Sequence, residues 1–413
     1  MSLLRAILGP ARSVRPAPAV ADGLPPDDGV LLDAPDGRLA PALVSAALGD
    51  HRPAARLLAA TRDAARWEDR DRYVVRLAAF AHGRGEWLTR WLEDDPRDAD
   101  ALIVDAQLAV RRAWESPARA ERLREVGPLI DRAAEAAPRD PVPWRVALDH
   151  ARGTRAPHRV FASLWEQAVR RAPHHYGCHV SALAYLSAQC CGVRREAADP
   201  FQEAGAPFRA PGDTFVPGDT FQARGDSPRV PGDTFRVPGG TFVPDGSSRV
   251  PGGPARPAHG AHSECFDFAE QAALDALPDS LIQALPVRAA LTRLVNGGPG
   301  CVPAGRADAA ADRAILLSAR YAPGDPWPAE VRNVLAYVLV GRERWAAALH
   351  QFRLIGPYAT SLPWASPGLP WSPPGDDALG RFLDARDRAR LAAAAGVPSR
   401  GRAGRARSGG HYA

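Results

Sequence analysis

The segment Arg332-Asn-Val-Leu-Ala-Tyr-Val-Leu-Val-Gly-Arg-Glu-Arg-Trp-Ala-Ala-Ala-Leu-His-Gln-Phe-Arg-Leu-Ile355 predicts a pair of helices. Small residues at Ala336 and Ala348 would let these two helices approach closely. The helical period of apolar residues also occurs upstream, as in residues 73–80, where it places the apolar side chains on one helix face. Strand-like alternation of comparable length is absent from the sequence. We therefore expect an all-α chain.

The segment also matches the tetratricopeptide motif. The leucine and phenylalanine of that motif fall on Leu335 and Phe352, and Arg332 stands where the motif begins with tryptophan. Its small and apolar positions fall on Ala336, Leu339, Ala348 and Ile355. Helix-start signals such as Asp140-Pro-Val-Pro-Trp144 recur every 35–45 residues or so, the period of stacked helical hairpins. The sequence thus predicts a tetratricopeptide-like α-solenoid.

One region interrupts the helical pattern. Pro-Gly-Asp-Thr-Phe occurs at 211–215, 217–221 and 231–235, with unequal spacing, in a stretch dense in glycine and proline. Such a composition cannot bury enough apolar surface to offset chain entropy, so we expect a disordered insertion. The predicted divisions are a disordered leader (1–37), a helical-repeat domain (38–191 and 264–295), the insertion (192–263), a linker (296–306), a tetratricopeptide-like segment (307–380), and a short helix with a basic tail (381–413).

The basic charge is concentrated at the two ends of the chain. The formal net charge is +5, and Arg5, Arg12 and Arg15 near the start lie in a region without acids. The C-terminal tail likewise carries only basic charges, at Arg400, Arg402, Arg405 and Arg407. Charges elsewhere are interspersed, as in Arg66-Trp-Glu-Asp-Arg70, a pattern typical of a solvated helix face. Nucleic-acid association is therefore expected to be weak at most and confined to the tails.

Composition excludes further classes of protein. The longest apolar run, Val334 to Gly341, is far shorter than the roughly 18 residues that span a bilayer. Five irregularly spaced cysteines argue against a secreted disulfide scaffold. The N-terminus lacks the apolar core of a signal peptide. We expect a cytoplasmic protein.

Several motifs occur in a fixed order: Trp87-x3-Trp91 with Asp95-Pro-x-Asp-Ala-Asp-Ala-Leu102, Ala113-Trp-Glu115, Asp140-Pro-Val-Pro-Trp144, His175-Tyr-Gly-Cys-His179 and Cys265-Phe-Asp-Phe-Ala-Glu270. In this order the chain resembles an uncharacterised actinobacterial family catalogued as a domain of unknown function. The resemblance covers roughly residues 60–191 and 264–360, and Cys178 and Val193 depart from the family pattern. It implies an α-helical, tetratricopeptide-like domain and no known activity.

The densest group of reactive side chains is His174, His175, Tyr176, Cys178 and His179. His175 and His179, spaced i and i+4, could chelate a metal, but Cys190 or Cys191 would lie about 16 Å further along the same helix. A Cys178–histidine nucleophile is a second possibility, although no orienting Asn or Asp lies nearby in sequence. The favoured interpretation is structural, with the rings packed at a helix start and hydrogen-bonded to the neighbouring hairpin.

Other motifs indicate no chemistry. Residues 93–100 are acidic but lack the glycine and glutamate of a calcium loop, and residues 297–306 lack the Gly-Lys-Ser/Thr of a phosphate loop. Trp364 and Trp371 could be exposed or could pack on the last hairpin. We therefore predict a non-catalytic protein-interaction scaffold for an unidentified partner, without a cofactor. One alternative is an enzyme or metal-binding protein centred on the cluster at 174–179. The other is a protein that associates weakly with nucleic acid through its Arg-rich tails.

Overall fold

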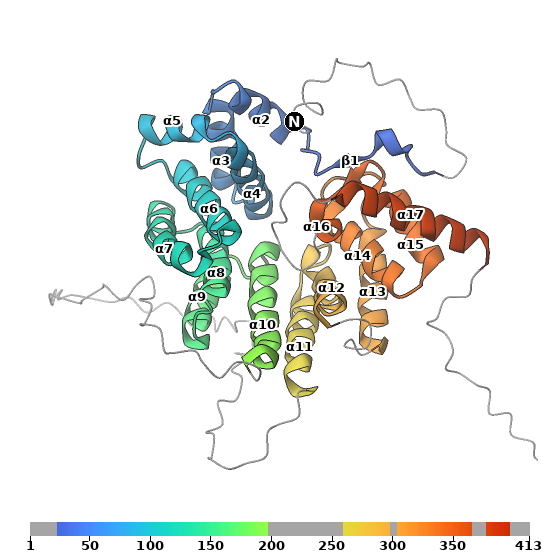
Figure 1. Cartoon of the computed structure of the whole chain (residues 1–413). Helices are drawn as coiled ribbons and strands as arrows, with labels where there is room; N and C mark the ends of the chain where they lie inside the picture. The colour runs from blue at the N-terminus through green and yellow to red at the C-terminus, as the bar shows by residue number, and fades with distance from the viewer. Residues whose placement is uncertain (1–22, 197–258, 298–303, 366–376, 397–413) are drawn as a thin grey trace, which may run out of the picture.

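The computed structural model describes residues 23–196, 259–297, 304–365 and 377–396, which are mostly helical (Figure 1). The first half contains α2 (Leu39–Ala47), α3 (Arg52–Asp63), α4 (Trp67–Gly83), α5 (Glu86–Asp94), α6 (Ala99–Glu115), α7 (Arg119–Ala136), α8 (Val142–Gly153), α9 (His158–Arg171) and α10 (Tyr176–Glu196). The second half contains α11 (His259–Asp275), α12 (Leu285–Gly297), α13 (Ala304–Ser318), α14 (Ala329–Gly341), α15 (Trp345–Ile355), α16 (Ser361–Trp364) and α17 (Ala378–Ala394). Short elements are η1 (Asp27–Gly29), η2 (Leu281–Ala284), and the strands β1 (Leu31–Leu32) and β2 (Tyr358–Ala359). The prediction of an all-α chain is confirmed for the described residues.

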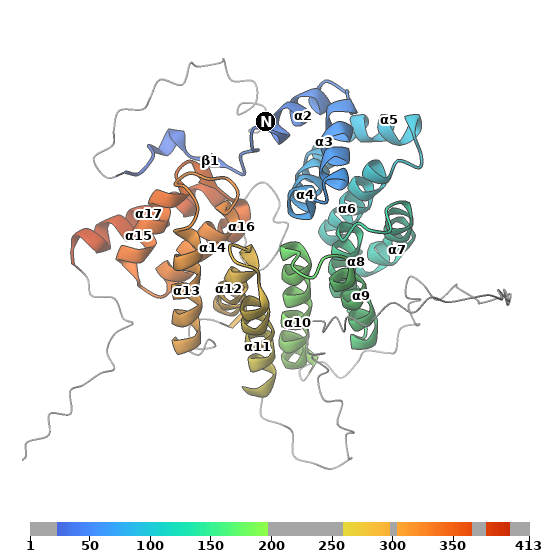
Figure 2. The same cartoon turned by 180° about the vertical axis from the view of Figure 1, so that it is seen from behind.

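Consecutive helices contact each other, as α6 does α7 and α14 does α15, and alternate helices also contact one another. Helices α4, α6, α8, α10, α12 and α14 form one continuous row in which each contacts the next. Figure 2 shows the two halves from behind, with α10 and α11 side by side between them, as they also are in Figure 1. This row brings the start of α10 close to the start of α4.

Aspartates and prolines set where helices begin. Asp98 precedes α6, and its carboxylate accepts hydrogen bonds from the backbone N–H groups of Asp100 and Ala101 at 2.7 and 3.0 Å. Asp140 accepts from the N–H of Val142 at 2.9 Å, and Pro143 occupies the first turn of α8, where no N–H donor is needed. The acidic stretch 93–100 is thus a helix-capping turn.

The apolar interior consists of two clusters that meet at α10. One extends from Leu39 to Tyr185, and the other contains Leu24, Val30 and residues from Leu183 to Ala389, so α10 contributes to both. Phe268 of α11 packs against each of them. Burial of this apolar surface, at about 25 cal/mol per Å², is the main force that holds the halves together.

Residues 23–37 correct the prediction of a disordered leader. Leu24 and Val30 are buried in the second cluster, and β1 pairs in parallel with β2. Asp33 accepts hydrogen bonds from the backbone N–H and the hydroxyl of Ser361 and forms an ion pair with Arg76 of α4. We call residues 23–37 the N-terminal strap, because they connect the C-terminal helices to α4. Disorder was predicted because this region lacks a helical period of apolar residues. The strap is held instead by backbone hydrogen bonds and by carboxylate contacts, which need no such period.

The segment that matches the tetratricopeptide motif forms α14 and α15. Its motif positions are almost fully buried: Leu335, Ala336, Leu339, Ala348, Phe352 and Ile355. Arg332, at the tryptophan position, is also buried and donates hydrogen bonds to Ser318 Oγ and to four backbone carbonyls. Trp364 packs on Phe352 and Phe382 and donates its indole N–H to Asn333, so it docks on the last hairpin.

Three predicted boundaries shift. Helix α10 continues to Glu196 and α11 begins at His259, so both helices extend into the predicted insertion. Helix α13 begins at Ala304, inside the predicted linker. Residues 197–258, 298–303 and the Arg-rich tail lie outside the described residues. Within the described part, none of the helices combines the length and the apolar character that crossing a membrane requires.

Candidate functional site

The predicted cluster lies where the first turn of α10 meets the first turn of α4. His175, Cys178 and His179 are buried, and His174 and Tyr176 are half-buried. The structure thus brings the five candidates to one place, but their side chains have different neighbours.

His175 caps the start of α10. Its Nδ1 accepts a hydrogen bond from the backbone N–H of Cys178 at 3.2 Å, and its Nε2 lies 3.3 Å from the carbonyl oxygen of Trp67. Because the carbonyl can only accept, this pattern places a proton on Nε2 and makes Nδ1 the acceptor. Burial acts to lower the pKa of His175, but Cys178, Glu68 and Asp71 outweigh this effect and raise the pKa to about 10. The ring therefore satisfies one of the free N–H groups of the helix start.

Glu68 of α4 satisfies a second N–H group there. Its Oε1 accepts from the backbone N–H of Tyr176 at 2.6 Å. Burial raises the pKa of Glu68, against the opposing effects of His175 and of this hydrogen bond. The approach of the two helices is close: a Cβ on Gly177 would lie 2.0 Å from Asp71 Oδ2. Glycine is therefore required at position 177 for α4 and α10 to pack as they do.

The Cys178 thiol lies beside His175, with Sγ 3.1 Å from Nδ1. Asp71 Oδ2 lies 3.8 Å from Nε2 of the same ring and so supplies the carboxylate that the sequence neighbourhood lacks. The order Cys–His–Asp resembles that of a nucleophilic triad. However, Cys178 is only 1% exposed, and burial raises its pKa, so the thiol is protonated at neutral pH. Cysteine reactivity requires an accessible thiolate, which this arrangement does not provide.

His179 faces away from His175. Its Nδ1–H donates to the carbonyl oxygen of His175 at 2.9 Å, and its ring packs against Trp165 and Phe268, which also contact each other. Burial lowers the pKa of His179 to about 4. The i, i+4 spacing therefore does not converge on one point. In the ranges that the structure describes, side chains of His, Cys, Asp and Glu form no group of three or more suited to a metal.

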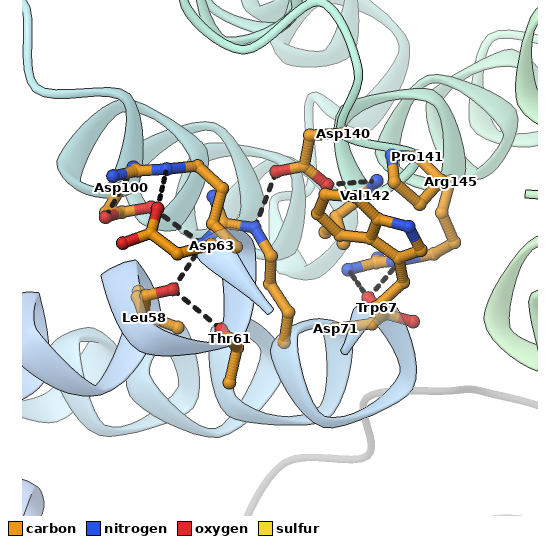
Figure 3. A network of polar contacts seen from close by, with 12 residues as sticks. Leu58, Thr61, Asp63, Trp67, Asp71, Asp100, Asp140, Pro141, Val142 and Arg145 are labelled. Carbon is orange, nitrogen blue, oxygen red and sulfur yellow. Dashed lines mark hydrogen bonds and ion pairs between the residues drawn. The ribbon is translucent and has the colours of Figure 1, made fainter. Parts of the chain in front are cut away.

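A network of buried ion pairs, drawn in Figure 3, lies beside the cluster and reaches it through Asp71, which is 3.8 Å from His175 Nε2. Arg70 has no exposed surface, and it pairs with Asp140 at 2.6 Å and with Asp100 at 2.7 Å. Arg145 pairs with Asp71 at 2.6 Å. Arg70 belongs to the charged run 66–70 that was predicted to form a solvated face, and that prediction is wrong for this residue; Asp71 directly follows the run. They lie on the side of α4 that faces α6 and α8, so their charges are buried but paired.

A pocket of about 420 Å³ opens next to the cluster. It is lined by Ala65, Arg66, Trp67, Glu68 and Asp69 around the start of α4, by residues 171–175 before α10, and by Trp327 before α14. Both His174 and His175 reach this pocket. Sequence reasoning did not bring Arg171 and Trp327 together, because they are far apart in the chain and Trp327 belongs to a helix-start signal, Asp325-Pro-Trp-Pro, that indicates no site.

Comparison of the chain with protein-family models, curated proteins and solved structures finds no match. Geometry and chemistry alone therefore guide the functional proposal.

Proposed function

We propose that the chain is a non-catalytic protein-interaction scaffold, a tetratricopeptide-like stack of helical hairpins. The continuous row from α4 to α14 and the burial of the motif positions in α14 and α15 support this architecture. Stacks of this kind present extended surfaces that bind other proteins.

One observation carries the proposal: the accessible pocket and the reactive pair are separate. The pocket is lined by two indole rings and by charged side chains, whereas Cys178 is sealed beneath it. His175 reaches both places, but its hydrogen bonds serve the start of α10. Apolar pockets with a few polar groups serve recognition as well as chemistry, and here the nucleophile that chemistry would need is not exposed.

The test is recovery of a partner from the cells that make the protein. The chain would carry an affinity tag, and bound proteins would be quantified against a tagged helical protein of similar size. We expect one protein to be recovered near a 1:1 ratio and the complex to re-form from purified components. A chain with no such partner but with one equivalent of bound zinc, iron or copper by elemental analysis would refute the scaffold and support the metal alternative.

A further inference from the structure

The pocket beside α4 and α10 has walls from both halves of the molecule. Trp67 is the first residue of α4, and Trp327 lies in the loop before α14. Arg72 holds Trp327 in place, since its guanidinium lies 4.6 Å from the ring centroid and donates to the carbonyl of Pro326 at 3.5 Å. Trp327 is therefore a fixed part of the pocket and not a loose surface side chain.

Arg171, at the end of α9, is the unbalanced charge of this pocket. Its Nε donates to the carbonyl of Pro138 at 2.6 Å, and its Nη1 donates to the backbone and side-chain oxygens of Gln167, both at 2.8 Å. Its guanidinium stacks on Trp144 at 4.4 Å. None of the carboxylates of the described ranges forms an ion pair with it, and burial together with Arg170 lowers its pKa. Arg171 is thus held in one orientation without a counter-ion.

The acids of the pocket are already engaged. Glu68 accepts the N–H of Tyr176, and Asp69 pairs with Arg66 at 3.4 Å and with Arg72 at 3.3 Å. A ligand of this pocket would therefore place a negative charge next to Arg171 and an apolar group near the indole rings. A volume of about 420 Å³ suits one large side chain with its neighbours rather than a helix.

We infer that this pocket binds an extended segment of the partner protein that carries an aromatic side chain next to an aspartate or glutamate. The aromatic ring packs with Trp67 and Trp327, and the carboxylate pairs with Arg171. A guanidinium that is already oriented loses little entropy when it binds a carboxylate, which favours this anchor. The inference rests on the proposed scaffold function and specifies the chemistry of its partner.

The test begins with a displayed library of random seven-residue peptides, selected on the full chain. We expect the selected peptides to share an acid adjacent to Phe, Tyr or Trp. The best peptide, labelled with fluorescein, is then titrated by anisotropy against the wild type, Arg171→Gln and Trp327→Ala. The matched control is Arg170→Gln, because Arg170 is exposed, pairs with Glu166 and does not line the pocket.

A double-variant cycle separates direct pairing from loss of folding. Replacing the acid of the peptide by its amide should weaken binding about tenfold on the wild type and on Arg170→Gln, yet leave binding to Arg171→Gln unchanged. Equal weakening on all three proteins, or a selection without acidic aromatic peptides, would overturn the inference. A synthetic peptide of residues 209–222, which holds two Asp-Thr-Phe sequences, is the competitor. If it bound more tightly than the selected peptides, the occupant would be the chain itself and not a partner.

Failure of this inference is distinguishable from failure of the scaffold function. A cellular partner that is recovered near 1:1 and binds Arg171→Gln and Trp327→Ala as well as the wild type would keep the scaffold and discard the pocket as its contact.

Discussion

Replacement of Arg70 by methionine should destabilise the protein by about 3–5 kcal/mol, the usual cost of removing one partner from a buried ion pair. Arg70 is fully buried and contacts Asp140 at 2.6 Å, Asp100 at 2.7 Å and the carbonyl of Leu58 at 3.1 Å. Asp100 keeps a pair with Arg62 at 2.7 Å, but Asp140 loses its only ion pair within the described residues. Most of the cost therefore comes from one buried carboxylate left without a cation.

Urea denaturation followed by circular dichroism measures this loss as a lower midpoint at constant slope. The matched control is Arg122→Met, which removes a pair with Glu125 in which both side chains are more than half exposed, and it should cost at most about 1 kcal/mol. The double variant Arg70→Met, Asp140→Asn should recover part of the stability, because it removes the stranded charge. A cost below about 1 kcal/mol for Arg70→Met, or a double variant less stable than the single one, would refute this reasoning.

Three further changes probe the contacts around α10 and α14. Gly177→Ala should lower stability by about 1–3 kcal/mol, because its Cβ would meet Asp71, whereas Gly83→Ala, which meets nothing within 4 Å, should change the melting temperature little. Burial lowers the pKa of His179 to about 4, against about 6.5 in the unfolded chain. The buried neutral ring therefore contributes fully to the free energy of unfolding above pH 6.5, and this contribution is lost as the pH falls towards 4. The free energy of unfolding should thus fall by about 3 kcal/mol between pH 6.5 and pH 4 in the wild type, and this fall should be absent when the stability of His179→Phe is measured against pH. Arg332→Lys should cost at least about 3 kcal/mol in urea melts, since an ammonium cannot reach all the carbonyls that the guanidinium satisfies.

The sequence was sufficient to predict helices, because a 3.6-residue apolar period is a local property. It was not sufficient to tell which charged residues of a helix are buried. Arg70 and Asp71 follow Glu68 and Asp69 in one charged run, and only packing against α6 and α8 distinguishes them. Where a neighbouring helix supplies opposite charges, a polar position becomes an interior one.

The candidate site was predicted in part. The cluster at 174–179 was located, and its interpretation as a packed helix start agrees with the hydrogen bonds of His175. Its partners Trp67 and Glu68 lie 108 residues earlier in the chain. Trp327 reaches the same pocket from the other half of the molecule. Such contacts are set by the order of helices in the row, which local patterns do not encode.

The N-terminal strap also has a consequence for how the chain folds during synthesis. Residues 24–33 are synthesised early, yet they bind β2, Ser361 and Arg386, which are synthesised more than 300 residues later. The strap therefore stays unbound, with Leu24 and Val30 exposed to solvent, while more than 300 further residues are synthesised. Helices α2 to α10 can pack as they emerge, but the strap can bind only once β2 and Ser361 have emerged as well. A nascent chain stopped before β2 should thus be cleaved by protease ahead of α2, whereas the finished protein should be protected there.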